Sequence, residues 1–478
     1  MKKILALAMT LSMLICMLPT AYAVQSEFTD MPEEDYWSYH ALQSAVDNGL
    51  MQGYGGKLSP KSYLTRAQMA AMTNRAFGAT EQADISSYTD VDPNSVLTPE
   101  LAKAVRMGTF QGNGVRMMPG ANITRQQAFV VLARALKLED GTAEDLARFT
   151  DANQVGTWAV PQVAAMVKAG YVNGNGQLLN PQGLITREQF AQVMYNMIAK
   201  YIDRADTYTE LPDGNILIRV PDVVLKDVAV KGDLIVGDGV GSGDVTLDHV
   251  SVEGRVVIRG GGEHSIKIIN GSQIGNVIVS KSASGAVRVR TESGCLVDAV
   301  IINDGQDNVI LEGNFNKVVV ESSIPVALKD ATVATMTINT ESTEVSLDGA
   351  TKVASVEITE QAAGAKLEVS QKAAVAAIES AADDVTISGS GKVQSAIISG
   401  DNTSVNTAGT SVTAVSGTTG VTANNKPVAS GTTANTPSGS GSGGSGSGGS
   451  GSGGSSSGGS SSGGSSSGGS SSGGTTSV

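Results

Sequence analysis

The sequence predicts a multidomain α + β chain in which a pseudo-threefold helical bundle is followed by a parallel β-helix and a disordered tail. Three observations support this prediction. A motif recurs three times before residue 204, short alternating apolar segments follow it, and the last segment is almost wholly Gly and Ser. The predicted boundaries are 1–23 for a signal peptide, 24–83, 84–144 and 145–204 for three repeats, 205–425 for the β-solenoid, and 426–478 for the tail.

The N-terminal residues predict a secretory signal peptide. Lys2 and Lys3 precede an apolar run, and Ala21-Tyr22-Ala23 is a small-x-small cleavage signal. The run is too short and wrongly flanked for a membrane-spanning helix, so a secreted mature chain without membrane insertion is expected. The mature chain retains Cys295, which has no partner for an internal disulfide and is expected to be a small buried hydrophobe.

The charge balance excludes one class of partner. The chain has 33 basic and 46 acidic residues and a formal net charge of −13, and removal of the two signal lysines makes the charge more negative. Nucleic acid is therefore not expected as a partner, because binding it requires a basic face.

The Gly/Ser tail has almost no apolar groups to offset chain entropy, so it is predicted to be disordered.

A motif recurs three times before residue 204. Each copy begins with an aromatic residue, Thr and Asp, and continues with two glycines four residues apart. A proline follows seven residues after the second glycine, and a Thr-Arg pair lies five residues after the proline. Three copies with the same internal spacing indicate a repeat architecture. The aspartates are Asp30, Asp90 and Asp151, the second glycines Gly53, Gly112 and Gly174, and the arginines Arg66, Arg125 and Arg187.

Each copy is predicted to form a helix, a loop and a second helix. The glycines end the first helix and permit the positive φ that a tight loop needs. The second helix begins at the Thr, and the Gln three residues later completes a capping box. The core face of the first helix is expected to hold Trp37, Ala41, Leu42, Ala45 and Val46. The core face of the last helix is expected to hold Phe190, Val193, Met194, Met197 and Tyr201.

The order aromatic-Thr-Asp, Trp, Gly-x-x-x-Gly, Pro and Thr-Arg-x-Glu/Gln resembles the S-layer homology (SLH) family over residues 28–204. The resemblance implies a pseudo-threefold helical bundle whose grooves bind secondary cell-wall polysaccharide, often pyruvylated, or related peptidoglycan-linked polymers. It places the chain at the bacterial cell wall and surface, in or beside an S-layer, with S-layer proteins as candidate partners. Two departures from the family pattern occur. All three copies have Gln in place of the usual Glu, and Val96 stands where the other copies have Trp37 and Trp158.

The three motif arginines are predicted to contact the wall polymer. Each lies in the first turn of a helix, where free backbone amides and the helix dipole favour an anion, and a guanidinium adds a charge-assisted grip. The alternative is a salt bridge from each arginine to a motif aspartate. The tryptophans are expected either to stack on a sugar or to anchor their helices in the core. The expected polysaccharide-binding residues are Arg66, Arg125, Arg187, Trp37, Trp158, Gly53, Gly112 and Gly174.

Residues 205–425 predict a parallel β-solenoid. Segments 223–236 and 245–258 align at an offset of 22, with apolar residues at matching alternate positions. Short alternating strands separated by Gly, Asn and Asp, without a helical pattern, are typical of a parallel β-helix. One or two β-sandwiches are the competing fold, because their strands also alternate.

No enzyme activity is predicted for this segment. Polysaccharide-degrading sites need grouped carboxylates, and sugar clefts usually contain aromatic platforms. Residues 205–425 contain one phenylalanine, Phe315, no tryptophan, and two isolated histidines, His249 and His264. Catalytic residues, metal ligands and cofactors are therefore not expected. The main hypothesis is a wall-anchored surface protein whose solenoid serves as a spacer or display region. The alternative is a wall-tethered polysaccharide-degrading enzyme with its active site on the β-helix.

Overall fold

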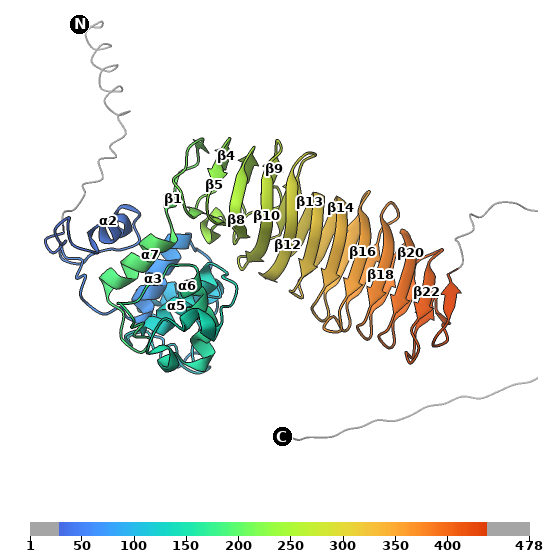
Figure 1. The fold of residues 1–478 in the computed structure, drawn as a ribbon, viewed down its shortest axis with the longest axis horizontal. Helices are drawn as coiled ribbons and strands as arrows, with labels where there is room; N and C mark the ends of the chain where they lie inside the picture. Colours follow the sequence, from blue (N-terminus) through green and yellow to red (C-terminus); the bar gives the residue numbers. More distant parts are fainter. Residues whose placement is uncertain (1–27, 437–478) are drawn as a thin grey trace, which may run out of the picture. The chain divides into compact units, whose positions relative to one another are not determined.

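The computed structural model describes residues 28–436. A helical module spans residues 28–199 and a solenoid spans residues 200–436 (Figure 1). The described residues of both parts belong to one compact unit. The predicted signal peptide at 1–23 and the tail beyond residue 436 lie outside the described residues.

The helical module contains two α-helices for each repeat. The second helix of each repeat packs on the first helix of the next, so that α3 contacts α4, α5 contacts α6, and α7 contacts α2. This cyclic exchange closes the module and confirms the predicted helix-loop-helix units. The helices are α2 (Tyr39–Asp47), α3 (Arg66–Phe77), α4 (Thr98–Arg106), α5 (Arg125–Ala135), α6 (Val160–Lys168) and α7 (Arg187–Met197). Short 3-10 turns span Ala143–Leu146, Ala152–Gln154 and Thr157–Ala159.

Three backbone hydrogen bonds form a ring that joins the repeats. The Leu64 amide donates to the Ile185 carbonyl at 3.0 Å, and the Ile185 amide donates to the Ile123 carbonyl at 3.2 Å. The Ile123 amide closes the ring by donating to the Leu64 carbonyl at 2.9 Å. Each residue directly precedes a Thr-Arg pair, and all three side chains are fully buried. The middle copy therefore occupies the same structural position as the other two, as the pseudo-threefold prediction requires.

The second helix of each repeat begins at the predicted threonine. Thr65, Thr124 and Thr186 are the N-caps of α3, α5 and α7. Each threonine hydroxyl accepts a hydrogen bond from the backbone amide of the Gln three residues later, and that Gln side chain accepts one from the threonine amide. The three predicted capping boxes are confirmed, and each satisfies two amides that a bare helix end would leave open.

One helix assignment and one core assignment were wrong, although Tyr201 is buried in the core of the helical module as predicted. Tyr201 does not extend α7, because the helix ends at Met197 and Tyr201 lies in strand β1 (Lys200–Ile202). The helical module therefore ends at residue 199 rather than 204. Trp37 lies before α2 and its side chain is 52 % exposed, so it is not part of the core face. The buried residues of α2 are Ala41, Leu42 and Ala45.

Residues 200–423 form a parallel β-solenoid. Every described pairing among β1–β23 is parallel, which excludes the competing β-sandwich. One stack of strands contains β1, β3 (Ile216–Ile218), β6 (Leu234–Val236), β8 (Ser251–Ile258), β10 (Gln273–Lys281), β12 (Leu296–Gly305), β13 (Val309–Val320), β14 (Val326–Ile338), β16 (Lys352–Ile358), β18 (Ala374–Ser380), β20 (Lys392–Ile398) and β22 (Ser411–Ala414). The other strands are β2 (Thr207–Tyr208), β4 (Val223–Lys226), β5 (Ala229–Val230), β7 (Val245–Asp248), β9 (Lys267–Ile269), β11 (Val287–Thr291), β15 (Glu344–Asp348), β17 (Lys366–Val369), β19 (Thr386–Ser388), β21 (Ser404–Asn406) and β23 (Thr422–Ala423).

Inward side chains stack in ladders along the solenoid. The predicted offset of 22 is confirmed where Val223 lies beside Val245 and Leu225 beside Leu247. Branched apolar side chains fill such a pleated interior well, which explains the Val and Ile content. One ladder, with one residue from each successive strand of the first stack, is Ile202, Ile218, Val236, Ile258, Val279, Ile302, Val320, Ile338, Ile358, Ser380, Ile398 and Ala414.

The solenoid ends in an antiparallel cap. Strand β25 (Thr433–Asn435) pairs with β22, and β24 (Lys426–Pro427) pairs with β23. The Thr436 hydroxyl donates to the Thr407 carbonyl at 2.6 Å, and Val428 is buried. The prediction that disorder begins at residue 426 was therefore wrong for residues 426–436. This segment pairs with the edge of the last coil, which would otherwise present unpaired backbone groups.

Candidate functional site

A groove with a cavity volume of about 1170 Å³ lies where the three repeats meet. Trp37 of the first repeat and Arg125 of the second line it together with α7 and the 172–180 loop of the third. An amide side chain can both donate and accept hydrogen bonds, so an amide-rich lining suits the hydroxyl groups of a sugar. The amide side chains that line the groove are Gln154, Asn173, Asn175, Asn180, Gln189, Gln192 and Asn196.

Two carboxylates also line the groove, and both are buried with protein partners. Asp151 accepts hydrogen bonds from the Leu179 amide at 2.9 Å and the Asn180 amide at 2.7 Å. Glu188 accepts a hydrogen bond from the Ser38 hydroxyl at 3.3 Å. Both carboxylates are therefore already engaged by protein donors, and the exposed lining combines amide side chains with Trp37 and the aliphatic Leu178.

The tryptophans of the motif are exposed. The side chains of Trp37 and Trp158 are 52 % and 54 % exposed, which excludes the core-anchor alternative. Val96, at the equivalent position of the middle repeat, is 88 % exposed. An indole that stands in solvent beside polar groups offers an apolar platform of the kind on which a sugar face stacks. Of these three residues only Trp37 lines the groove.

Each motif arginine extends to the loop of the following repeat. Its Nε donates to the carbonyl of the residue five positions after the second glycine of that repeat. The guanidinium groups thus connect the repeats in a cycle, and part of each one is already bound by protein. The bonds join Arg66 to Met117 at 2.8 Å, Arg125 to Leu179 at 2.9 Å, and Arg187 to Leu58 at 2.7 Å.

The first-turn amides of these helices are not free. The arginine amides donate to carbonyls of the neighbouring repeat at 2.8–3.0 Å. The next amide of each helix donates to the carbonyl of Pro119, Pro181 or Pro60, and the third donates to the N-cap threonine. The expectation that free backbone amides at these helix N-termini favour an anion was therefore wrong, because packing between repeats uses those donors, whereas contact between the arginine side chains and the wall polymer stays a prediction.

Arg125 differs from the other two motif arginines. Arg66 and Arg187 each donate a second hydrogen bond, through Nη2, to another carbonyl of the same loop at 3.0 Å. Within residues 28–436 Arg125 donates only through Nε, so its two Nη atoms have no protein partner. Burial lowers the pKa of Arg125 and nearby Asp151 opposes this shift, but a guanidinium stays charged at neutral pH. Arg125 is the motif arginine best placed to donate to a ligand.

The motif aspartates bind backbone amides instead of the arginines. Each accepts two hydrogen bonds, of 2.7–2.9 Å, from consecutive amides in the loop of its own repeat. Burial alone would raise the pKa of Asp90, but the Met117 and Met118 amides hold it below its ordinary value. No ion pair between described residues joins a motif arginine to these aspartates. The salt-bridge alternative was therefore wrong, although both groups hold the same loop.

The second glycines lie against the aromatic residue that begins each motif. A side chain there would collide with the ring, so the glycine permits the loop to approach it closely. Gly174 also lines the groove, so its backbone is open to a ligand. An added Cβ would lie 2.2 Å from the Phe28 ring at Gly53, 2.6 Å from the Tyr88 ring at Gly112, and 2.6 Å from the Phe149 ring at Gly174.

Sequence reasoning missed the amide side chains of the third repeat. The segment Asn173-Gly174-Asn175 carried a local signal, because the equivalent positions of the other copies are less rich in Asn. Gln192 and Asn196 lie one helical turn apart on α7 and reach the same groove from a different element. Their association with the loop depends on packing between elements, which spacing alone does not give.

Neither a metal centre nor a membrane span is present in residues 28–436. No group of three His, Cys, Asp or Glu side chains in that range is arranged to hold a metal ion. The helices of the described range are all too short or too polar to cross a bilayer.

Comparison with known proteins finds a family match for two of the three helical repeats. A family model of the S-layer homology domain matches residues 27–70 and 148–191. The surface-layer 125 kDa protein of Lysinibacillus sphaericus is 31 % identical over 186 residues, or 38 % of this chain and 15 % of that protein. S-layer protein sap of Bacillus anthracis is 26 % identical over 195 residues, or 40 % and 24 %. Exoglucanase XynX of Acetivibrio thermocellus is 24 % identical over 172 residues, or 35 % and 16 %.

The chain thus spans no more than 24 % of each of these three relatives. The two family matches and the surface-layer relatives indicate a cell-surface protein whose S-layer homology domains anchor it at the cell wall. The middle copy lies between the two matched segments.

Proposed function

We propose that the chain binds a cell-wall polysaccharide non-covalently through the groove beside Trp37, and that its solenoid holds other surface components away from the wall. We further infer that the middle copy, residues 84–144, is a third S-layer homology repeat. It shares the capping box, the aspartate-held loop and the hydrogen-bond ring of the two matched copies.

The groove is the observation that supports this proposal most directly. It combines a half-exposed indole, a guanidinium with two unpartnered Nη atoms, and seven amide side chains. A sugar stacked on Trp37 would present its hydroxyl groups to the amides, and an acidic substituent would find Arg125. An anionic polymer, pyruvylated or otherwise, therefore suits this site even though the chain is acidic overall.

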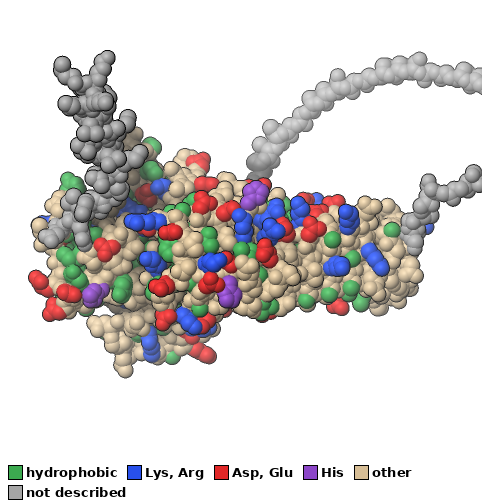
Figure 2. Space-filling model, turned by 90° about the horizontal axis from the view of Figure 1, so that it is seen from above, with side chains coloured by type: hydrophobic (Ala, Val, Ile, Leu, Met, Phe, Trp, Pro, Cys, Tyr) green, Lys and Arg blue, Asp and Glu red, His purple; other side chains and the backbone are tan. Residues whose placement is uncertain are grey.

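The surface of the solenoid supports a spacer role. Of the twelve large apolar side chains exposed among the described residues, nine lie in the helical module and three in the solenoid. Figure 2 shows acidic and basic side chains interspersed over one face, with no extended patch of a single sign. A polar surface of mixed charge lacks the contiguous apolar patch that a large apolar partner would bind. S-layer proteins are proposed as neighbours of this surface.

Co-sedimentation with purified wall sacculi tests the proposal. The chain from residue 24 onward is mixed with native sacculi and with sacculi whose non-peptidoglycan polysaccharide has been removed by acid. Trp37→Ala and Arg125→Gln are compared with Tyr195→Ala, which removes an exposed aromatic of α7 that does not line the groove. We expect binding to native sacculi only, weakened about tenfold or more by the two groove variants and unchanged by the control.

Two results would contradict the proposal. Equal binding to stripped sacculi would identify peptidoglycan itself as the ligand. Native-like binding by both groove variants would move the binding site away from Trp37 and Arg125.

A wall-tethered polysaccharide-degrading enzyme is the second candidate function. Relatives of this chain include proteins named exoglucanase, endoglucanase and amylopullulanase. On the solenoid, Glu344 and Glu368 line a groove of about 430 Å³, although Glu344 pairs with Lys366 at 2.8 Å. Release of reducing sugar from wall polymer, abolished by Glu344→Gln or Glu368→Gln, would favour this candidate. Polymer binding without any release favours the anchor and spacer.

A further inference from the structure

The first coils of the solenoid are buried on both faces. Strands β3, β6 and β8 point Leu217, Ile235 and Val257 outward, yet all three side chains are fully buried and belong to the apolar core of the helical module. Further along the same outward ladder lie Glu357 and Glu379, which are exposed. Between these two regions the ladder passes through Ile301 and Val319, which are partly exposed, so the outward side chains are fully buried only where they meet the helices.

Three solenoid arginines donate to carbonyls at or beside the C-terminal ends of helices. Each bond satisfies a carbonyl that the helix leaves open, and a cation there is favoured by the helix dipole. The same three arginines pair with Asp203, Asp233 and Asp238 of the solenoid. The bonds are Arg219 Nη1 to the Arg75 carbonyl at 3.2 Å, Arg255 Nη1 to the Lys137 carbonyl at 2.6 Å, and Arg259 Nη2 to the Met107 carbonyl at 2.9 Å.

Arg259 is the centre of this contact. Its side chain is fully buried, its Nε donates to Asp238 Oδ2 at 2.7 Å, and its guanidinium lies over the Phe77 ring at 5.6 Å. A charge buried in this way is tolerated only with its partners in place, because removal of one partner leaves the other unpaired in a dry environment. The helical carbonyl of Met107 is one of those partners, so the arginine depends on both parts of the chain.

The backbones of the two parts also approach closely. Gly78 ends α3 and lies against Gly239, where an added Cβ would come within 2.8 Å of the Gly239 Cα. A Cβ at Gly239 would lie 2.2 Å from the Arg219 carbonyl oxygen. A Cβ at Gly237 would lie 2.9 Å from the Phe77 carbonyl oxygen. Gly237 and Gly239 thus permit the coil to reach the helix end and place Asp238, which lies between them in the sequence, beside Arg259.

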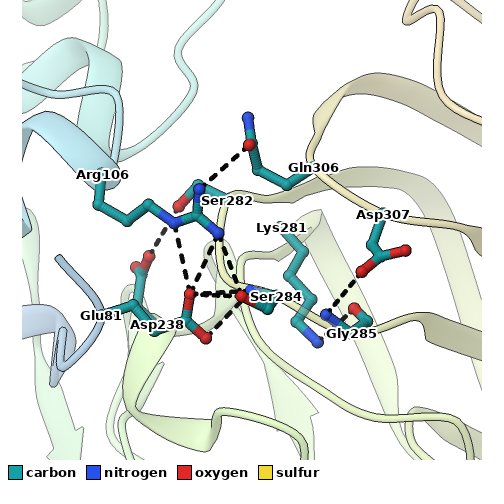
Figure 3. A network of polar contacts seen from close by, with 9 residues as sticks. All are labelled: Glu81, Arg106, Asp238, Lys281, Ser282, Ser284, Gly285, Gln306 and Asp307. Atoms are coloured by element: carbon teal, nitrogen blue, oxygen red, sulfur yellow. Dashed lines mark hydrogen bonds and ion pairs between the residues drawn. The ribbon is translucent and has the colours of Figure 1, made fainter. Parts of the chain in front are cut away.

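A polar network surrounds the edge of the contact (Figure 3). Glu81, in the segment after α3, accepts hydrogen bonds from the Ser284 amide at 2.9 Å and the Ser284 hydroxyl at 3.0 Å. Arg106 pairs with Glu81 at 3.2 Å and donates to Gln306 at 3.1 Å. The first two repeats are therefore joined to solenoid loops more than 170 residues away in the sequence.

We propose that the first coils of the solenoid cap the helical module, so that the two parts unfold as one cooperative unit and hold one fixed orientation. Arg219, Arg255 and Arg259 are positioning residues that join helix ends to coils. A fixed orientation relative to the wall rests on the proposed function, whereas the coupling of the two parts does not.

Thermal unfolding of the chain from residue 24 onward tests the coupling. Both tryptophans lie in the helical module, so their fluorescence reports that part alone, while far-UV circular dichroism reports the loss of helices and strands together. Coincident transitions by the two probes are expected if the parts unfold together.

Arg259→Met is the informative variant, and Arg290→Met is its control. Arg290 is another solenoid arginine, and its side chain is half-exposed. It pairs with Glu312 at 3.2 Å and takes no part in the contact with the helices. Arg259→Met is expected to lower the fluorescence midpoint by roughly 10 °C and to separate it from the dichroism midpoint. Arg290→Met is expected to leave the two transitions coincident.

Should Arg259→Met fail to fold, Glu81→Gln at the half-exposed edge is expected to give a smaller separation in the same direction. Separate transitions in the unmodified chain would overturn the proposal. Coincident transitions in both Arg259→Met and Glu81→Gln would overturn it as well. Sacculus binding is measured on the same samples. Loss of coupling with binding retained contradicts only this inference, and coupling without binding contradicts only the proposed function.

Discussion

Replacement of Gly112 by Ala tests whether the middle repeat is built like its two neighbours. The new Cβ would lie 2.5 Å from the Arg116 carbonyl oxygen, 2.6 Å from the Tyr88 ring and 3.1 Å from the Met117 sulfur. The sulfur can move, but the carbonyl belongs to the loop that Asp90 holds through two amides. The loop must therefore shift away from the ring or the aspartate.

The expected cost is that of overpacking a well-packed site, about 2 kcal/mol of unfolding free energy. Gly120 provides a matched control in the same repeat. A Cβ there meets no atom within 4 Å, and the other two repeats carry Lys61 and Gln182 at this position. Gly120→Ala is expected to be neutral or to stabilise by about 0.5 kcal/mol, because it restricts the unfolded chain.

Urea unfolding followed by tryptophan fluorescence measures both variants. The expected result is a clear fall in the midpoint for Gly112→Ala, at unchanged slope, beside an unchanged or raised midpoint for Gly120→Ala. Equal midpoints for the two variants would refute the reasoning, since they would mean that the loop of the middle repeat does not pack against Tyr88.

Three further changes have defined expectations. Thr124→Ala removes the N-cap of α5 and should lower the unfolding free energy by about 1 kcal/mol in the same urea assay. Ser380→Ala should raise the unfolding free energy by about 1 kcal/mol when urea unfolding is followed by far-UV circular dichroism, because the buried Ser380 hydroxyl in the apolar ladder has no hydrogen-bond partner, and a fall would contradict this. Burial alone would raise the pKa of Glu100, but hydrogen bonds from Asn74 and Lys103 hold it below its ordinary value. A depressed carboxylate pKa stabilises above the unfolded-state pKa, so stability should fall as pH drops from about 5 to 3, less steeply in Glu100→Gln.

Much of the fold was predictable because it is repetitive. The spacing of Gly112, Thr124 and their equivalents specified helix ends and caps, since glycine conformation and threonine capping act within a few residues. The offset of 22 between Val223 and Val245 specified one coil of the solenoid, because stacked strands place equivalent residues in register. Local rules failed at the two ends of the solenoid. Tyr201 pairs with strand β3 instead of extending α7, and the segment after residue 425 pairs with β22 and β23 instead of being disordered.

The candidate site was predictable in part. Trp37 and Arg125 were identified from the motif and do face one groove. Their surroundings were not, because Asn173 and Gln192 come from a different repeat and a different element. The partners of the helix amides were likewise hidden, since the prolines that accept from them lie in the neighbouring repeat.

The sequence by itself therefore determined the repeat units, their caps and the coil of the solenoid, because those depend on contacts between residues close in the chain or one period apart. Only the tertiary structure decided how the repeats exchange partners, which arginine keeps free donors, and where the solenoid meets the helices. Those outcomes depend on groups brought together from distant segments, such as Arg259 and the Met107 carbonyl, whose pairing reflects burial and geometry rather than spacing.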